Sequence, residues 1–306
     1  MIFSVIGTGA IGGYYGAKLA KAGEEVHFLF HKDYEHVLAN GLEVRSKAGD
    51  FKLEKVNAYR RTQDMPKSDI VIVGLKTVNE SMLAELLPPL LKEDTLVLLI
   101  QNGIGVEEDV QAMFPGLWLA AGLAFICSAK TEPGVVNHQD YGHITIGNYS
   151  CPDNTKVAAL VDAFRNAGVV ASEVEYHEAR WRKAVWNMPF NGLTVARETS
   201  TDKLLSDPET YALVEGMMLE VIHAAQHLGV KGIDESFAAK MLDMTIKMTP
   251  YSPSMKLDWD FHRPMEIYYL YTKPIMTARK TGFEMPLLSA LEEDLKRKES
   301  TRNTKR

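Results

Sequence analysis

The sequence predicts an α/β protein in which a doubly wound parallel sheet is followed by an all-helical domain. Two observations lead to this prediction. Short apolar runs alternate with helix-like segments through the first half of the chain, which is the pattern of β-α-β units with right-handed crossovers. After about residue 175 the strand-like runs stop, and long segments with helical periodicity follow. We therefore expect a sheet domain over residues 1–174 and a helical domain over residues 175–306.

The first half supplies the strands of the sheet and the helices between them. Continuous apolar runs bounded by turn residues are typical of buried strands. The expected strands are 3–6, 26–30, 70–75, 95–100 and 119–126, with further β-like stretches at 142–147 and 169–174. The expected helices are 11–22, 34–39, 81–91, 106–113 and a segment around 156–166.

The second half supplies helices, which we expect at 178–191, 207–228, 236–248, 266–281 and 286–298. Asp207 has the character of a helix N-cap, because Pro208 follows at the first helical position. We expect the basic tail from residue 296 to be a frayed, solvated end. His223 and His227 are four residues apart, but a third ligand is missing, so no metal site is predicted.

Composition and charge exclude several classes of function. The 306 residues are enough for two hydrophobic cores, and 34 basic against 40 acidic side chains leave a net charge of −6. A broad nucleic-acid surface or a polybasic membrane anchor is therefore not expected. Two cysteines are too few for a disulfide framework, and the apolar stretch at the start lacks the basic flank of a secretory leader. A cytoplasmic protein is the expectation.

A glycine-rich turn follows the first expected strand directly and opens the first expected helix. This context is what a dinucleotide-binding fingerprint of the Rossmann type requires. The first glycine permits the tight turn, the second lets the backbone approach a pyrophosphate, and the third lets helix and strand pack closely. The turn consists of Gly7, Thr8, Gly9, Ala10, Ile11 and Gly12.

Residues at the carboxyl ends of the next strands bear on the cofactor. The second expected strand ends in His31, Lys32 and Asp33. A histidine and a lysine suit the 2′-phosphate of NADP, whereas an acid at this place is typical of NAD-binding domains, so NADP is favoured and Asp33 argues for the alternative. Lys76 and Asn102 follow two further strands and are candidates for the nicotinamide end of the cofactor, or simple turn residues.

One expected helix, 178–191, carries a polar stripe on an otherwise apolar surface. Lys183, Asn187 and Asn191 are spaced by four and so lie on one helix face. Buried polar groups need partners, which allows two interpretations. The stripe either faces a ligand cleft or forms a hydrogen-bond ladder between helices. Pro189 in the same segment is expected to kink the helix.

Taken together, these motifs resemble the family of ketopantoate reductases, also called 2-dehydropantoate 2-reductases, over nearly the whole chain. The similarity rests on the glycine fingerprint, Leu75-Lys76, Asn102-Gly103-Ile104-Gly105, Trp181-Arg182-Lys183 with Asn187 and Asn191, Ser254-Met255, and Glu266. In that family a Rossmann domain precedes a helical domain like that of 6-phosphogluconate dehydrogenase. The resemblance implies reduction of a 2-oxo acid with NADPH.

The resemblance also implies roles for individual residues. Lys183 matches the general acid that protonates the ketone oxygen, and Glu266 matches a carboxylate near cofactor and substrate. The positions that match substrate-binding residues are Asn102, Asn187, Asn191 and Ser254. The candidate cofactor-binding residues are the turn 7–12, His31, Lys32, Lys76, Asn102 and Glu266. Two departures from the family pattern are His31, where arginine is frequent, and Gly192, where proline is usual.

The sequence thus predicts an NADP-dependent oxidoreductase that reduces ketopantoate to pantoate in pantothenate synthesis. One alternative is a related reductase of another branched or hydroxylated 2-oxo acid, for which the residues near Tyr251, Trp259 and His262 would be decisive. A second alternative is a non-catalytic NADP-binding regulatory protein. The expected partner is a small 2-oxo acid, and a homodimer through the helical domain is compatible with the sequence.

Overall fold

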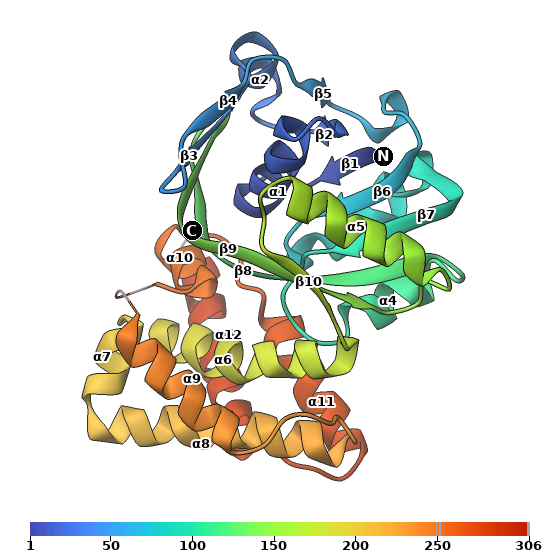
Figure 1. Ribbon diagram of the computed structural model, residues 1–306. Coiled ribbons are helices and arrows are strands. Elements are labelled where there is room, and N and C mark those ends of the chain that lie inside the picture. Colours follow the sequence, from blue (N-terminus) through green and yellow to red (C-terminus); the bar gives the residue numbers. More distant parts are fainter. Residues whose placement is uncertain (249, 251, 305–306) are drawn as a thin grey trace. The chain divides into compact units, whose positions relative to one another are not determined.

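The computed structural model describes residues 1–248, 250 and 252–304, and the chain divides into two compact units (Figure 1). Unit 1 contains Met1–Gln101 and Glu107–Tyr176, whereas unit 2 contains Asn102–Val106 and the chain from His177 onward. The chain therefore passes into unit 2 two residues after the division expected from the sequence. The short segment Asn102–Val106 belongs to unit 2 although both of its neighbours along the chain belong to unit 1.

Unit 1 is built on one twisted, mostly parallel sheet. Its described strands are β1 (Ile2–Ile6), β2 (Glu25–Leu29), β3 (Leu42–Ser46), β4 (Phe51–Leu53), β5 (Asn57–Tyr59), β6 (Ser68–Val73), β7 (Leu91–Leu99), β8 (Trp118–Glu132), β9 (Val135–Asn148) and β10 (Ala171–Val174). The strand order is β4-β3-β9-β8-β7-β6-β1-β2-β5, and β10 pairs with β9. Among the described pairs, β3–β4 and β8–β9 are antiparallel and the others are parallel.

The helices of unit 1 are α1 (Ala10–Lys21), α2 (Tyr34–Asn40), α3 (Leu83–Leu86), α4 (Val106–Met113) and α5 (Asn154–Asn166). Helices α1 and α5 pack against each other and against β9 on one face of the sheet (Figure 1). The expected doubly wound α/β sheet is confirmed. The large side chains Phe3, Tyr15, Phe28 and Phe164 are almost fully buried between these layers.

Three local expectations for unit 1 were wrong or incomplete. The helix expected at 81–91 is a 3₁₀ turn (Thr77–Met82), the single-turn α3 and a second 3₁₀ turn (Pro88–Leu90). Two adjacent prolines explain the break, because proline lacks an N–H and disfavours the α region in the residue before it. The strands β3, β4 and β5 were missed. β4 and β5 have three residues each and lack a buried apolar run, whereas β3 alternates the buried Leu42 and Val44 with charged side chains.

The antiparallel hairpin β8–β9 is much longer than the apolar runs that predicted its strands. Its register extends from Ala120 opposite Asn148 to Glu132 opposite Val135. The outer half of β8 is only partly buried and carries charged side chains such as Lys130. A strand of that kind shows no continuous apolar run, so the sequence pattern ended at residue 126.

Unit 2 is helical, as expected. Its described elements are α6 (Tyr176–Ala196), which starts on the last residue of unit 1, α7 (Thr201–Ser206), α8 (Pro208–His227), α9 (Ser236–Lys247), α10 (Ser254–Asp260), a π-helical turn (Tyr268–Thr272), α11 (Lys273–Lys280) and α12 (Pro286–Thr304). Among the described helices of the whole chain, none is both long enough and apolar enough to cross a membrane. The core of unit 2 includes the fully buried Val185, Met188 and Phe190 of α6.

The structure corrects several expectations for unit 2. The basic tail is not frayed, because α12 continues to Thr304 and Arg302 Nη2 donates a hydrogen bond of 2.8 Å to the Arg263 carbonyl. The segment 266–281 is not one regular α-helix, since the π-helical turn interrupts it. Helix α6 continues through Pro189 to Ala196, five residues beyond the expected end. Helices α7 and α10 were not expected.

The predicted N-cap of α8 is confirmed. The Asp207 carboxylate accepts hydrogen bonds from the N–H groups of Glu209, at 2.8 Å, and Thr210, at 3.1 Å, and Pro208 occupies the first helical position. These two N–H groups have no carbonyl partner within the helix, so the cap satisfies donors that the helix itself leaves open.

Replacing this cap is expected to weaken unit 2. In Asp207→Ala the two N–H groups lose their acceptor, which should lower the free energy of unfolding by about 1 kcal/mol. Asp207→Ser, which keeps a side-chain acceptor, should lose at most a few tenths of that amount. Urea unfolding followed by circular dichroism at 222 nm measures the difference. Equal stability of the alanine and serine variants would contradict the assignment of the cap.

Candidate active site

The glycine turn joins β1 to α1 in unit 1, and the structure shows why two of its glycines are needed. Gly7 has a φ of +84°, and a Cβ on it would overlap the backbone N of Leu75. A Cβ on Gly12 would lie 2.5 Å from the Gly7 carbonyl oxygen and 3.1 Å from Val5 Cγ1. Any side chain at these positions would push α1 away from the sheet, as expected for the fingerprint.

Gly9 differs from these two because a Cβ on it would meet no atom within 4 Å. It is the N-cap residue of the 12-residue helix α1, whose first turn contains no acidic side chain. The N-terminus of a helix of this length carries partial positive charge and unpaired N–H groups. The open space beside Gly9 therefore fits an anionic group that approaches the backbone closely.

Several contacts fix the turn to neighbouring strands. Thr8 Oγ1 donates a hydrogen bond of 2.7 Å to the Leu29 carbonyl at the end of β2. Lys130 Nζ on β8 donates one of 2.8 Å to the Thr8 carbonyl and forms an ion pair with Asp33. His31 and Lys32 between these strands are exposed, and Lys76 is partly buried after β6. Lys130 was missed from the sequence because it belongs to no motif and lies more than 120 residues from the turn.

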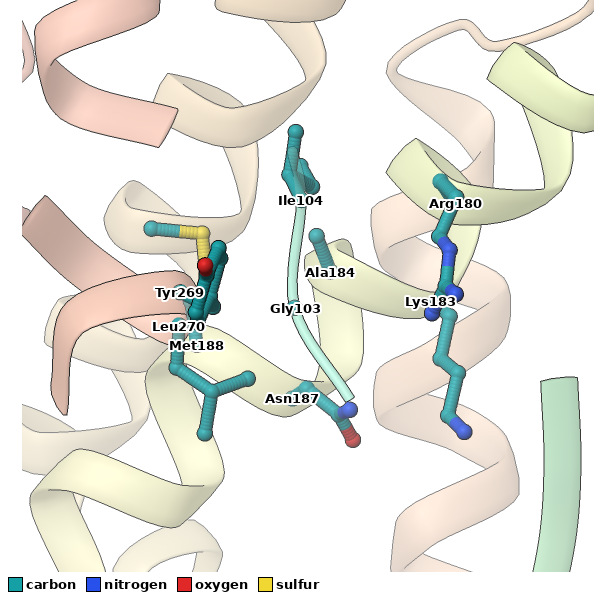
Figure 2. A pocket seen from close by; sticks show the side chains of 9 residues that line it. All are labelled: Gly103, Ile104, Arg180, Lys183, Ala184, Asn187, Met188, Tyr269 and Leu270. Carbon is teal, nitrogen blue, oxygen red and sulfur yellow. The ribbon is translucent and has the colours of Figure 1, made fainter. Parts of the chain in front are cut away.

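A pocket in unit 2 lies between α6, the segment Asn102–Val106 and the π-helical turn (Figure 2). Polar side chains from α6 and apolar groups from the other two elements form its wall. The lining residues are Gly103, Ile104, Arg180, Lys183, Ala184, Asn187, Met188, Tyr269 and Leu270. Figure 2 shows Lys183 and Asn187 extending to the same side of α6, as their spacing of four predicts.

The segment after Asn102 is held tightly against the π-helical turn. Ile104 N donates a hydrogen bond of 3.0 Å to the Tyr269 carbonyl. Gly103 has a φ of +110°, and a Cβ on it would lie 2.5 Å from both Cβ and the carbonyl oxygen of Tyr269. Only glycine fits this close approach. The partly exposed Asn102 therefore has a well-defined position at the entrance of the segment.

Lys183 is a partly buried cation with an unusual acidity. Burial, the largest cause, and the positive charge of Arg180 lower the pKa of Lys183 to about 7, although the negative charge of Glu266 opposes the change. Both effects follow from the cost of holding an ammonium away from water and near another cation. Glu266 itself is 7% exposed and lies two residues before the start of the π-helical turn. Arg180, which the sequence analysis did not single out, is also buried in this wall.

The two asparagines of the α6 stripe have different environments. Asn187 lines the pocket. Asn191 is 2% exposed, and its Nδ2 donates a hydrogen bond of 3.0 Å to the Asn187 carbonyl. Its Oδ1 accepts bonds from Met255 N at 3.0 Å and from Ser254 Oγ at 3.4 Å. The stripe thus combines the two interpretations, with a pocket-facing part at Lys183 and Asn187 and a ladder between helices at Asn191.

The remaining candidates fall outside this pocket wall. Trp259 packs under the cations of Lys298 and Arg302, with 5.6 and 4.7 Å to the ring centroid, and Tyr251 lies outside the described residues. His223 contacts Glu235 at 2.7 Å, and His227 contacts the Thr281 carbonyl at 2.8 Å. Among the residues that the structure describes, no three potential ligands are grouped to hold a metal ion.

Models of one protein family match both units of the chain. The model of the family "Ketopantoate reductase PanE/ApbA" matches residues 3–150, and that of its C-terminal domain matches residues 175–299. A 2-dehydropantoate 2-reductase of Nostoc sp. is 44% identical over 300 residues, which cover 96% of this chain and 94% of that protein.

Solved structures give the same result. The structure of 2-dehydropantoate 2-reductase from Geobacter metallireducens has a TM-score of 0.94 at 38% identity and covers 97% of this chain and 99% of its own. The enzyme of the same name from Methylococcus capsulatus has a TM-score of 0.90 at 34% identity, covering 99% and 98%. The chain is an oxidoreductase and belongs to the ketopantoate reductase family.

Proposed function

We propose that Lys183 is the general acid with which this chain, an NADPH-dependent ketopantoate reductase, completes the reduction of its substrate. The observation that carries the proposal is the lowered pKa of Lys183, about 7, in a pocket that also contains Asn187. An ammonium of that acidity is well suited to stabilise a developing alkoxide and then to give it a proton at neutral pH.

The residues of unit 1 fit the cofactor by charge and shape. The open backbone at Gly9 and the N-terminus of α1 would receive the pyrophosphate, with Thr8, Ala10 and Ile11 completing the turn. The exposed His31 and Lys32 would receive the ribose phosphate, and Lys76, Asn102 and Glu266 would lie toward the nicotinamide. When bound, NADPH supplies the hydride that the ketone carbon accepts.

The residues of unit 2 would hold the 2-oxo acid and supply the proton. Lys183 Nζ transfers a proton to the ketone oxygen, which becomes the hydroxyl of the product. Arg180 offers a guanidinium for the substrate carboxylate, and amide groups of Asn102 and Asn187 would bind its oxygens. Asn191, whose amide is already engaged by Asn187 and Met255, would keep the Ser254 hydroxyl in place at the start of α10.

Glu266 would set the charge balance of this wall. Its carboxylate opposes the loss of the Lys183 proton, so that a useful fraction of the lysine stays protonated despite its burial. A non-catalytic regulatory protein would not need an acid of tuned pKa in its pocket, and this alternative is not favoured. We further propose a cytoplasmic enzyme, a homodimer formed through the helical domain of residues 175–306, and a cofactor domain over residues 1–174.

The substrate is tested by following NADPH absorbance with ketopantoate and a panel of other branched 2-oxo acids. We expect rapid loss of NADPH absorbance with ketopantoate and much slower loss with the others. Turnover of another 2-oxo acid at a higher kcat/KM would instead reassign the substrate, while the proposed roles of the residues would persist.

Removing the general acid is expected to slow turnover without removing the cofactor. In Lys183→Ala, kcat should fall by about 10²- to 10⁴-fold, because the alkoxide must take its proton from water. The Kd for NADPH, measured by fluorescence titration, should change by less than about threefold. Lys203→Ala, at an exposed lysine of α7, is the matched control and should leave kcat unchanged. Wild-type kcat in Lys183→Ala would remove this lysine from the mechanism.

The pH dependence of reduction should report the Lys183 pKa. Because the acid must be protonated, kcat/KM for reduction should fall about tenfold per pH unit above a pKa near 7. The Glu266 carboxylate raises this pKa, so Glu266→Gln should move the fall to lower pH. Glu178 lies on the same helix as Lys183 but is paired with Arg182 at 2.6 Å. Glu178→Gln should therefore leave the pH profile unchanged. A shift to higher pH in Glu266→Gln would contradict the assignment.

A substitution in the glycine turn is expected to weaken cofactor binding without destabilising the fold. Gly9→Ala adds a methyl group to open space at a φ of −85°, so the thermal midpoint of the protein without cofactor should stay within about 2 °C of the wild type. The same methyl would occupy the place of the pyrophosphate, and the Kd for NADPH should rise at least about tenfold. Unchanged NADPH affinity would show that the pyrophosphate binds elsewhere.

A further inference from the structure

An ion pair between Lys130 and Asp33 connects the glycine turn with the end of β2. Lys130 Nζ bonds to the Thr8 carbonyl of the turn and to the Asp33 carboxylate, and the Phe30 ring lies 5.6 Å from it. Asp33 also accepts a hydrogen bond of 3.0 Å from the N–H of Gly134 in the β8–β9 turn. The side chains of Lys130 and Asp33 are only 24% and 16% exposed.

Asp33 stays ionised, and Lys130 balances its negative charge. Burial opposes its ionisation, yet the hydrogen bonds from Lys130 and Gly134 and the charge of Lys130 outweigh burial, so the pKa of Asp33 lies below its usual range. At neutral pH the carboxylate is therefore ionised and directed toward two donors of β8 and the β8–β9 turn. Its negative charge is matched within the pair.

The location of this acid matters for cofactor choice. In NAD-binding sheets an acidic residue near the end of the second strand accepts hydrogen bonds from the ribose 2′-hydroxyl, and the same charge repels a 2′-phosphate. Asp33 occupies that part of the chain, four residues after the end of β2 at Leu29. His31 and Lys32, which precede it, have exposed basic side chains.

We propose that Lys130 sets the preference of this site for a 2′-phosphorylated dinucleotide by holding the Asp33 carboxylate away from the ribose. The inference rests on the proposed binding of NADPH at the glycine turn. Lys130 acts as a positioning residue. Its ammonium neutralises the acid, and its bond to Thr8 fixes the ammonium between the turn and the end of β2.

The test compares two ligands that differ only in the 2′-phosphate. Dissociation constants for NADPH and NADH are measured by isothermal titration with the full chain and no substrate. In Lys130→Met the uncompensated Asp33 should weaken NADPH binding at least about tenfold while NADH binding changes less than about threefold. Lys130→Arg, which retains the cation, should keep the wild-type ratio of the two constants.

A double variant distinguishes neutralisation of Asp33 by Lys130 from direct contact between Lys130 and the 2′-phosphate. In Lys130→Met with Asp33→Asn the repelling carboxylate is absent, so the NADPH affinity should return to within about threefold of wild type. Lys47→Met is the matched control, since this exposed lysine of unit 1 pairs with Asp140 at 3.5 Å. Thermal midpoints of all variants without cofactor establish that they are folded. If Lys130→Met alone is unstable, the NADPH and NADH affinities of Lys130→Arg and of the double variant still test the proposal.

The outcomes are distinct. A loss of NADPH affinity in Lys130→Met that the double variant reverses supports the proposal. Equal weakening of NADPH and NADH, no change in either, or a loss that persists in the double variant overturns it, the last because Lys130 would then bind the phosphate itself. Failure of the wild-type protein to bind either dinucleotide would instead remove the proposed cofactor site, on which the inference depends.

Discussion

The mechanism that we propose depends on one interaction, the balance of charge around a lysine held away from water. Burial and the neighbouring Arg180 favour the neutral amine of Lys183, and the Glu266 carboxylate favours the ammonium. The result is a pKa of about 7, at which both protonation states are populated at neutral pH. Neither a fully exposed lysine nor one buried without a carboxylate would have this property.

The elements of unit 2 position the charged groups that act on Lys183. Helix α6 presents Arg180, Lys183 and Asn187 from one side of the pocket. Glu266 lies in the irregular chain before the π-helical turn, and its negative charge acts on Lys183. The π-helical turn binds Ile104 through the Tyr269 carbonyl. A π-helical turn is uncommon and frequently occurs at functional sites. Here it provides the carbonyl to which the Asn102–Val106 segment is attached.

Much of this could be predicted from particular residues. The glycine turn between an apolar run and a helix, the spacing of Lys183, Asn187 and Asn191, and the cap at Asp207 are each recognisable from residues that are close together in the sequence. Local contacts leave local patterns, so these predictions agree with the structure. The prediction of a helix at 81–91 was wrong because Pro88 and Pro89 interrupt the segment despite its apolar residues. The strands β4 and β5 have too few residues for a pattern to emerge, and β3 carries only two buried apolar side chains.

The sequence by itself determined the alternation of strands and helices in the first half, the helical second half, the glycine turn and the face of α6 that carries Lys183. Each of these is encoded in neighbouring residues and their periodicity. Only the tertiary structure decided the acidity of Lys183, the internal bonding of Asn191 and the pairing of Lys130 with Asp33. These three properties arise between residues up to about a hundred positions apart along the chain. Burial and charge balance depend on which side chains folding brings together in space, and spacing along the sequence carries no record of that.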